Sequence, residues 1–405
     1  MRRVRKIALW VVGVVLTLGV VGYLGLQWYL GTGSARRMVA GEVSKAIGLP
    51  VEVTSVSVGF GGTSVGIVIP DADAETPTDF IRIGKIETDI TLGGLLTGSA
   101  TPTKVTVKDA DIILRLDANR KIVSPMPKLE GGGGDTKLPA VKVENARVRI
   151  RQPGKPEFDV AGVNAELRAE GEGSVVTGTI SDPKWGEWRI DGRLGEDPAD
   201  GSVTLTNDGL TVTDPKLLNS IPFVKEKVWK HLSATGPLAA TVTIPFKPNG
   251  DVDYDVTVKP KGATVTSPDA DVTVTQVTGD IHIAGGKVTA TNAQLSLAGG
   301  TVQADGGFDF GGDVYVLTLK AKASGLDMRK LPTSWRMPKE IEGQLKGTAN
   351  LEVHIPDSGK LDTRGSGSGE VENAKLFGLD TKSTEIKLQL KGGDGRYRFE
   401  TMQAK

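Results

Sequence analysis

The chain has 405 residues with 49 basic and 49 acidic side chains, so a net charge that would attract nucleic acid is missing and any basic groove would have to be local. It contains no cysteine, which excludes disulfide bonds and thiolate metal sites. The 53 glycines, the low aromatic content of 5% and the many alternating valines and threonines predict numerous strands with tight connections.

Residues 7–30 form an uncharged, apolar run of 24 residues. A helix of this length measures about 36 Å at about 1.5 Å per residue, which spans a hydrocarbon core of about 30 Å. The basic residues in 1–6 predict a cytoplasmic tip, with the rest of the chain carried across the membrane. A cleaved signal peptide is the alternative, but its apolar region is only about 7–15 residues long.

The next segment, 31–129, is expected to hold a short amphipathic helix at 34–47 followed by a β unit of alternating strands. Four consecutive glycines mark 130–136 as a linker and a domain boundary. A middle β region is expected at 137–232.

That middle region ends in a segment, 214–232, whose apolar residues recur with a helical period. The remainder, 233–405, is predicted to contain β repeats, because the sequence at 235–245 resembles that at 342–356. The second copy stops mid-repeat, so we expect either an open strand edge where another envelope protein would pair, or a sequence that is a piece of a longer protein.

A short motif with a slip in its alternation occurs three times. After Asp109, Asn145 and Asn373 the apolar residues change from odd to even positions, or the reverse, so the extra residue must be absorbed in a bulge or tight turn. The three copies are VKDADI at 107–112, VENARV at 143–148 and VENAKL at 371–376.

The order of these features resembles the AsmA-like family of bacterial envelope proteins, which are relatives of the repeating β-groove lipid-transfer proteins. The matching segments are the spanning helix, IGLPVEVTSVSVGF at 47–60, IETDITLGGLLTG at 86–98, VKDADIILRLDAN at 107–119, the helical segment at 214–232 and LSLAGGTVQADGGFDF at 295–310.

The resemblance implies a mainly β protein: a long, curved antiparallel β-groove, folded like a taco, with short helices and one N-terminal transmembrane helix. It also implies a bacterial inner-membrane anchor, a periplasmic body and an apolar channel for phospholipid acyl chains in envelope biogenesis. Alternation alone fits an ordinary β-sandwich equally well, because a sandwich also buries one alternating face.

The residues expected to line such a groove are the apolar members of the alternating strands, which point to one face. They are Val105, Val107, Ile112, Leu114, Leu116, Val141, Val143, Val148, Ile150, Ile281, Ile283, Leu295 and Leu297.

Residue patterns for catalysis are weak. The three histidines, His231, His282 and His354, lack metal-ligand spacing, and the GTSVG sequence at 62–66 leads into a strand instead of the helix that a nucleophile elbow needs. The glycine-rich GSGSG at 365–369 lacks the context of a phosphate loop. We therefore expect a protein that is not an enzyme and uses no cofactor or metal. The alternative function is a structural or assembly factor of the outer membrane or a secretion system.

Overall fold

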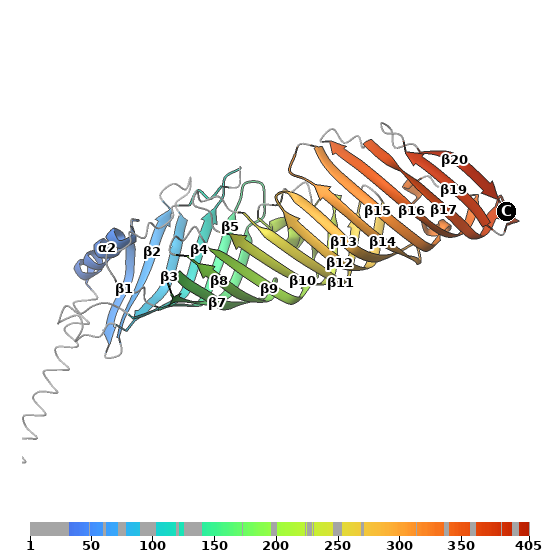
Figure 1. Cartoon of the computed structure of the whole chain (residues 1–405). Helices are drawn as coiled ribbons and strands as arrows, with labels where there is room; N and C mark the ends of the chain where they lie inside the picture. The colour runs from blue at the N-terminus through green and yellow to red at the C-terminus, as the bar shows by residue number, and fades with distance from the viewer. Residues whose placement is uncertain are drawn as a thin grey trace, which may run out of the picture. The chain divides into compact units, whose positions relative to one another are not determined.

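The protein is mainly β, and its strands form an open, mixed sheet in a computed structural model of the chain (Figure 1). Two compact units are distinguished by their internal contacts, and each is described by itself. The structure describes residues 32–47, 49–59, 62–71, 78–89, 103–118, 121–124, 140–171, 173–195, 201–222, 224, 229, 231–245, 253–268, 271–312, 314–335, 340–356, 362–381, 383–390 and 397–404.

In its described residues, the first unit consists of one helix and a run of strands that pair in chain order. The side chain of Ser44 in the helix accepts a hydrogen bond of 2.9 Å from the backbone N–H of Val51, which joins the helix to the first strand. The elements are α2 (Gly33–Ile47), β1 (Glu52–Gly59), β2 (Gly62–Asp71), β3 (Thr78–Thr88), β4 (Lys104–Arg115), β5 (Ala140–Arg151), β6 (Phe158–Glu170) and β7 (Gly173–Asp182).

The second unit is a run of antiparallel strands, again paired in chain order from β9 onward. Its strands are β8 (Gly186–Leu194, whose last two residues group with the first unit), β9 (Ser202–Val212), β10 (Ser233–Pro245), β11 (Asp255–Ser267), β12 (Val272–Ala284), β13 (Lys287–Leu297), β14 (Gly300–Asp309), β15 (Val314–Asp327), β16 (Ile341–Pro356), β17 (Asp362–Leu376), β18 (Leu379–Asp380), β19 (Ser383–Leu390) and β20 (Tyr397–Ala404). Its short 3-10 helices are η2 (Pro215–Ser220), η3 (Met328–Lys330) and η4 (Thr333–Trp335).

The expectation of a wholly antiparallel sheet is wrong at one place, because β4 and β5 are parallel. Parallel neighbours cannot be joined by a tight hairpin and need a longer crossover connection. The chain between these two strands includes the glycine-rich residues 130–136, which lie outside the described residues. Strand pairing within one unit therefore continues across the expected linker.

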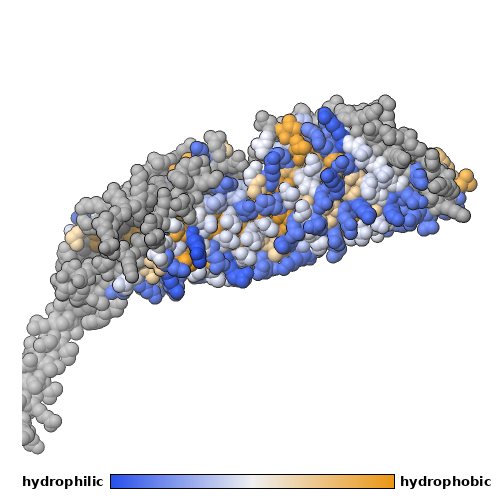
Figure 2. All heavy atoms as spheres, viewed as in Figure 1, coloured by the Kyte–Doolittle hydropathy of each residue, from blue (hydrophilic) through white to orange (hydrophobic). Residues whose placement is uncertain are grey.

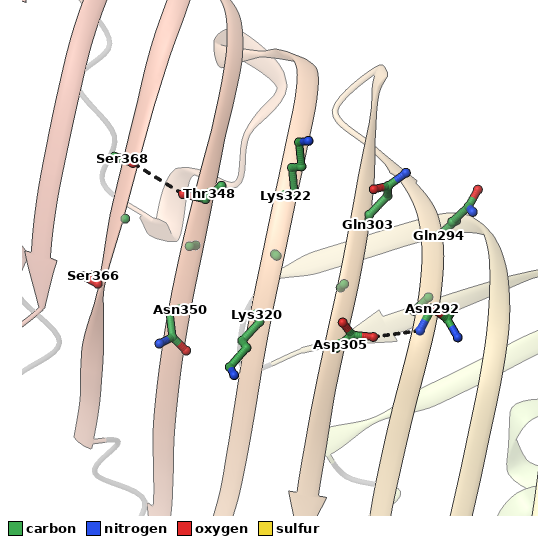
Figure 3. A pocket seen from close by; sticks show the side chains of 15 residues that line it. Asn292, Gln294, Gln303, Asp305, Lys320, Lys322, Thr348, Asn350, Ser366 and Ser368 are labelled. Carbon is green, nitrogen blue, oxygen red and sulfur yellow. Dashed lines mark hydrogen bonds between the residues drawn. The ribbon is translucent and has the colours of Figure 1, made fainter.

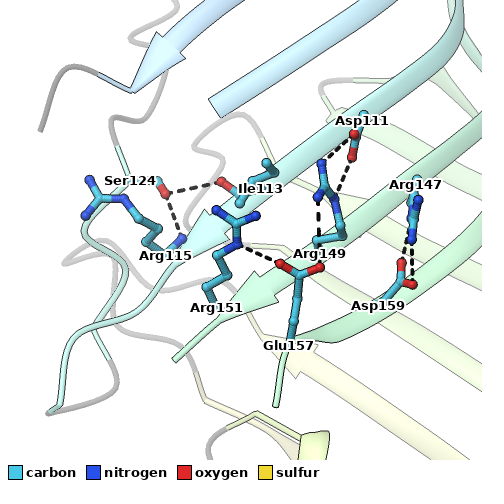
Figure 4. Close-up of polar contacts among 9 residues, drawn as sticks. All are labelled: Asp111, Ile113, Arg115, Ser124, Arg147, Arg149, Arg151, Glu157 and Asp159. Carbon is cyan, nitrogen blue, oxygen red and sulfur yellow. Dashed lines mark hydrogen bonds and ion pairs between the residues drawn. The ribbon is translucent and has the colours of Figure 1, made fainter. Parts of the chain in front are cut away.

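Ion pairs fix the register of the parallel pair and its neighbour (Figure 4). Arg149 of β5 donates from Nε and Nη2 to the two carboxylate oxygens of Asp111 in β4. Arg147 of β5 binds Asp159 of β6 in the same way, with both N···O distances 2.7 Å. Two-pronged pairs of this kind require a defined geometry, so they favour one alignment of the three strands.

A second group of charges links β3, β4 and β5. The ammonium of Lys108 lies 2.8 Å from one carboxylate oxygen of Glu87 and 3.6 Å from the carboxylate of Glu144. Lys85 lies 2.6 Å from the other Glu87 oxygen. Hydrogen bonds from Lys108 and then Lys85 lower the pKa of Glu87 to about 2.

The predicted slip in the recurring motif is confirmed as a set of left-handed residues. Asp109, Asn145 and Asn373 have φ angles of 52°, 56° and 48°. The first two lie side by side on the parallel strands, where the Asn145 side-chain amide donates a 2.7 Å hydrogen bond to Asp109. Asn145 and Asn373 lie at register shifts with the strands β6 and β16, respectively, whereas the pairing of β4 with β3 and β5 continues past Asp109 without a shift.

The two similar sequences that predict the repeat carry glycines at equivalent places. Gly236 near the start of β10 and Gly343 near the start of β16 have positive φ angles of 107° and 131°. A Cβ atom placed on either would come within 3.1 Å of a Cα atom of the next strand, that of Ala263 or Ala374 respectively. Both copies thus need glycine for the same close backbone approach.

The helical expectation for 214–232 needs correction in its first part. Residues 215–220 form the 3-10 helix η2, whose first turn is capped by the Asp214 carboxylate accepting from the Lys216 N–H at 2.9 Å. Much of the rest, and the expected membrane helix at 7–30, lie outside the described residues. Among the helices that the structure describes, none has the length and apolar character needed to cross a membrane.

Candidate functional site

One face of the second unit carries continuous apolar rows that run across the strands, and we call it the apolar face. In the first row, each residue is the register partner of the next. Leu317 is 38% exposed, and the other members are half-buried. The first row consists of Leu205, Val242, Val256, Ile283, Val288, Phe308, Leu317 and Val353.

The second row lies two residues further along each strand and is lined by smaller side chains. Its central members, Gly306, Leu319 and Leu351, are half-buried, although the sheet continues on both sides of them. The row consists of Ala240, Val258, Ile281, Ala290, Gly306, Leu319, Leu351 and Gly365, of which only Ala240 is buried.

At one end of these strands the apolar face is covered by an aromatic cluster. Phe310 and Tyr315 are buried there, and Val224, from the segment that follows η2, packs against them. Phe308 and Tyr315 meet edge to face with ring centroids 5.7 Å apart, and the ring of His231 also contacts Tyr315 at 6.4 Å. This end is a closed core.

The other end is covered by the segment that includes η3 and η4. Met328, Leu331 and Ile341 are buried against Leu326 and Val371, and the last of these is fully inaccessible. Along β14, the residues between this cluster at Val302 and the aromatic cluster at Phe308 span about 20 Å at about 3.3 Å per residue. The half-buried strip therefore lies between two packed borders.

The described strands belong to one sheet, and their main contacts all join neighbours in the hydrogen-bonded order. Figure 2 shows orange hydrophobic residues reaching the surface of this unit among blue hydrophilic ones. A central sheet face packed against another layer is normally buried to the density of an organic crystal. The described part of the chain contains no such layer over the two rows.

In the first unit, β4 and β5 bring eight of the expected lining residues together as cross-strand partners. All eight are half-buried, whereas Leu116, beyond β4, is buried. Leu114 also packs against the cluster around Phe80 in β1–β3. The pairs are Val105 with Val141, Val107 with Val143, Ile112 with Val148, and Leu114 with Ile150.

In the second unit, the expected residues are divided between the strip and its borders. Ile281 lies in the second apolar row. Ile283 lies in the first row and also contacts the aromatic cluster, while Leu295 and Leu297 pack against the cluster at the opposite border. Leu295 and Leu297 were expected to line an open groove, but they lie in a packed environment instead.

Sequence reasoning missed the central part of the strip. Leu317 and Leu319 of β15 and Leu351 of β16 occupy it. Their strands alternate between apolar and polar residues as regularly as those that were selected, so the signal was present. Strand order was needed to place them between the two borders.

Two histidines on the described strands lie beside carboxylates at the protein surface. His282 lies 2.8 Å from Asp255, and His354 lies 2.6 Å from Glu352, each on exposed or half-exposed side chains. The sequence at 62–66 begins β2 and the sequence at 365–369 lies inside β17, so both are strands. Within the described residues, no group of three potential metal ligands is found.

The site is therefore an apolar surface with fixed borders and few reactive groups. It is suited to holding flexible hydrocarbon through contact area, since such contacts are non-directional. Comparison of the chain with protein-family models, with curated protein sequences and with solved structures found no match.

Proposed function

We propose that this protein guides phospholipids between membranes by holding their acyl chains on the apolar face of a β-groove. The observation that carries the proposal is the first apolar row, which crosses eight strands without one fully buried member. Ile283, Val288 and Phe308 of this row pack against the aromatic cluster, whereas the other members leave apolar area accessible. Burying such area is worth roughly 25 cal/mol per Å², which favours an apolar occupant.

An acyl chain fits the direction of the rows. The second row runs across the strands from β10 to β17 beside the aromatic cluster, and successive strands are about 4.8 Å apart, so its eight strands offer about 34 Å of apolar contact. A side chain from a partner would cover only part of this length. A flexible hydrocarbon can follow all of it, and movement along the row exchanges one apolar contact for another.

The proposal includes the location expected from the sequence. Residues 7–30 would anchor the chain in the bacterial inner membrane, with residues 1–6 in the cytoplasm and the β units in the periplasm. Such an arrangement places one part of the chain next to the membrane that supplies lipid. The proposal involves no nucleotide site among the described residues. The driving force for lipid movement would come from a partner protein or from a lipid gradient.

Photocrosslinking tests the proposal in the full chain. A benzophenone amino acid is introduced at Leu319 or Leu351 on the apolar face, and at Thr318 or Glu352, which lie on the opposite face of the same strands but outside the depression found there. Cells expressing each variant are labelled with radioactive phosphate and irradiated. We expect labelled phospholipid on the two apolar-face variants and background on the two controls.

The outcome separates the two functions considered. Equal, background labelling at all four positions in folded protein would reject the lipid function. A crosslink from Leu319 or Leu351 to a protein, without phospholipid, would favour a structural or assembly factor whose partner covers the apolar face.

A further inference from the structure

The opposite face of β13–β17 contains an elongated depression of about 790 Å³, which we call the polar hollow (Figure 3). Its base follows a row of small residues whose side chains belong to the apolar face, so backbone is accessible between the polar side chains. These residues are Ala293, Ala304, Ala321, Ala349 and Gly367, each the register partner of the next.

Two rows of polar side chains border the hollow, one on each side of the small residues. They are separated by two residues along each strand, or about 7 Å, and each crosses five strands, or about 19 Å. The first row is Gln294, Gln303, Lys322, Thr348 and Ser368, and the second is Asn292, Asp305, Lys320, Asn350 and Ser366.

The two lysines of the hollow differ from several strand lysines elsewhere on the polar surface. Lys287 lies 3.3 Å from Asp309, and Lys259 lies 3.3 Å from Asp280. Among the described residues, neither ammonium in the hollow forms an ion pair.

The lysines and the carboxylate of the hollow also point in different directions. Figure 3 shows the Lys320 and Lys322 side chains diverging toward opposite ends of the strands. The carboxylate of Asp305 is instead engaged by the backbone N–H of Asn292 at 2.8 Å.

We propose that the polar hollow binds an acidic saccharide, laid across β13–β17. The two ammonium groups supply charge for a carboxylate or phosphate of the ligand. The amides of Gln303 and Asn350 offer both donors and acceptors, which is the pairing that sugar hydroxyl groups require. The elongated form of the hollow favours several linked units over a single small anion, whose contacts would occupy one lysine only.

This site is independent of the apolar face, because side chains at alternate positions point to opposite sides of the sheet. The ligand class is also different: the polar hollow would bind a charged, hydroxyl-rich ligand, and the apolar face would bind hydrocarbon. The acidic saccharide can be free or can be the head group of a glycolipid, and the recognised chemistry is the same.

The test uses the full chain in lipid nanodiscs and tetragalacturonate as the probe, at constant ionic strength. Binding is measured by isothermal titration calorimetry beside two controls: neutral cellotetraose, and tetraglutamate, which carries charge without hydroxyl groups. We expect tetragalacturonate to bind at least about tenfold more tightly than either control, since it satisfies both the ammonium and the amide groups. Equal binding of tetraglutamate, or no binding of tetragalacturonate, would overturn the assignment.

Variants then locate the site. Lys320→Gln with Lys322→Gln is expected to weaken tetragalacturonate binding about tenfold or more, whereas Lys259→Gln with Lys346→Gln removes the same charge outside the hollow and should leave it within about twofold. Asn350→Ala retains all charge and is expected to weaken binding about threefold or more.

Circular dichroism verifies that each variant is folded. Equal losses in the two lysine pairs would mean unspecific attraction and reject the hollow as the site. A glycolipid bearing the same acidic head group, added in the nanodisc, distinguishes a bound head group from a free saccharide by competing with the probe.

Discussion

Two leucines on the same strand provide a direct measure of whether the apolar face is open. Leu326 of β15 is 4% exposed within the cluster beside η3, whereas Leu319 lies in the half-buried second row. Leu326→Ala should cost about 3 kcal/mol, since it removes transfer energy and leaves an enclosed cavity. Leu319→Ala should cost about 1 kcal/mol, because part of the side chain is already exposed and an open site leaves no sealed cavity.

Hydrogen exchange of backbone amides in β15 and β16, followed by mass spectrometry on the full chain, gives the free energy of local opening for each variant. The comparison is internal, since both substitutions delete the same atoms from one strand. Added phospholipid should increase the cost of Leu319→Ala and leave that of Leu326→Ala unchanged, because a ligand that binds the folded state stabilises it. Equal costs of about 3 kcal/mol without lipid would show a filled interior and refute the open face.

Three further substitutions test the elements that shape the sheet. Asn373→Val should destabilise the protein by about 1–2 kcal/mol at its φ of 48°, while Asn373→Gly should change stability by less than about 0.5 kcal/mol, as measured by thermal unfolding. Arg149→Met leaves its half-buried carboxylate partner unpaired and should cost about 1–3 kcal/mol in urea unfolding, whereas Arg168→Met, at a 69% exposed side chain, should cost less than about 0.5 kcal/mol. Glu87, whose pKa Lys108 lowers from 4.5 to about 2, stabilises the fold above pH 4.5 and loses that contribution as the pH falls toward 2. The stability difference between wild type and Glu87→Gln, measured from pH 7 to pH 2, should therefore fall from at most about 1 kcal/mol at this solvent-screened site to zero; a constant difference would contradict it.

The strands and their bulges were predictable because they depend on neighbouring residues. Alternation sets which side chains share a face, and a slip in alternation must be accommodated where it occurs. Asp109, Asn145 and Asn373 were found in this way, and all three adopt the left-handed conformation. The repeat stays a prediction from similar sequences, in which Gly236 and Gly343 occupy equivalent places.

Features that depend on distant residues were not predictable from the pattern. The parallel alignment of β4 and β5 is a property of how the chain between them crosses over, and alternation is the same in parallel and antiparallel strands. The burial of Leu295 and Leu297 also depends on a remote segment, which includes η3 and η4. Strand order is therefore needed to tell which residues of one alternating series lie in a packed border and which lie in the uncovered strip.

The two proposed sites share one row of small residues on β13–β17, at the edge of the uncovered strip. Ala304 and Ala321 pack against the cluster beside η3, and Ala349 and Gly367 continue their row across the next two strands, so only small side chains separate this border from the strip. On the other side of the same strands, their backbone forms the base of the polar hollow. Ala321→Leu therefore separates the sites: its larger side chain points to the apolar face and should reduce crosslinking of phospholipid at Leu319, while tetragalacturonate binding in the hollow is retained. Loss of both together, in folded protein, would mean that the two faces act as one site.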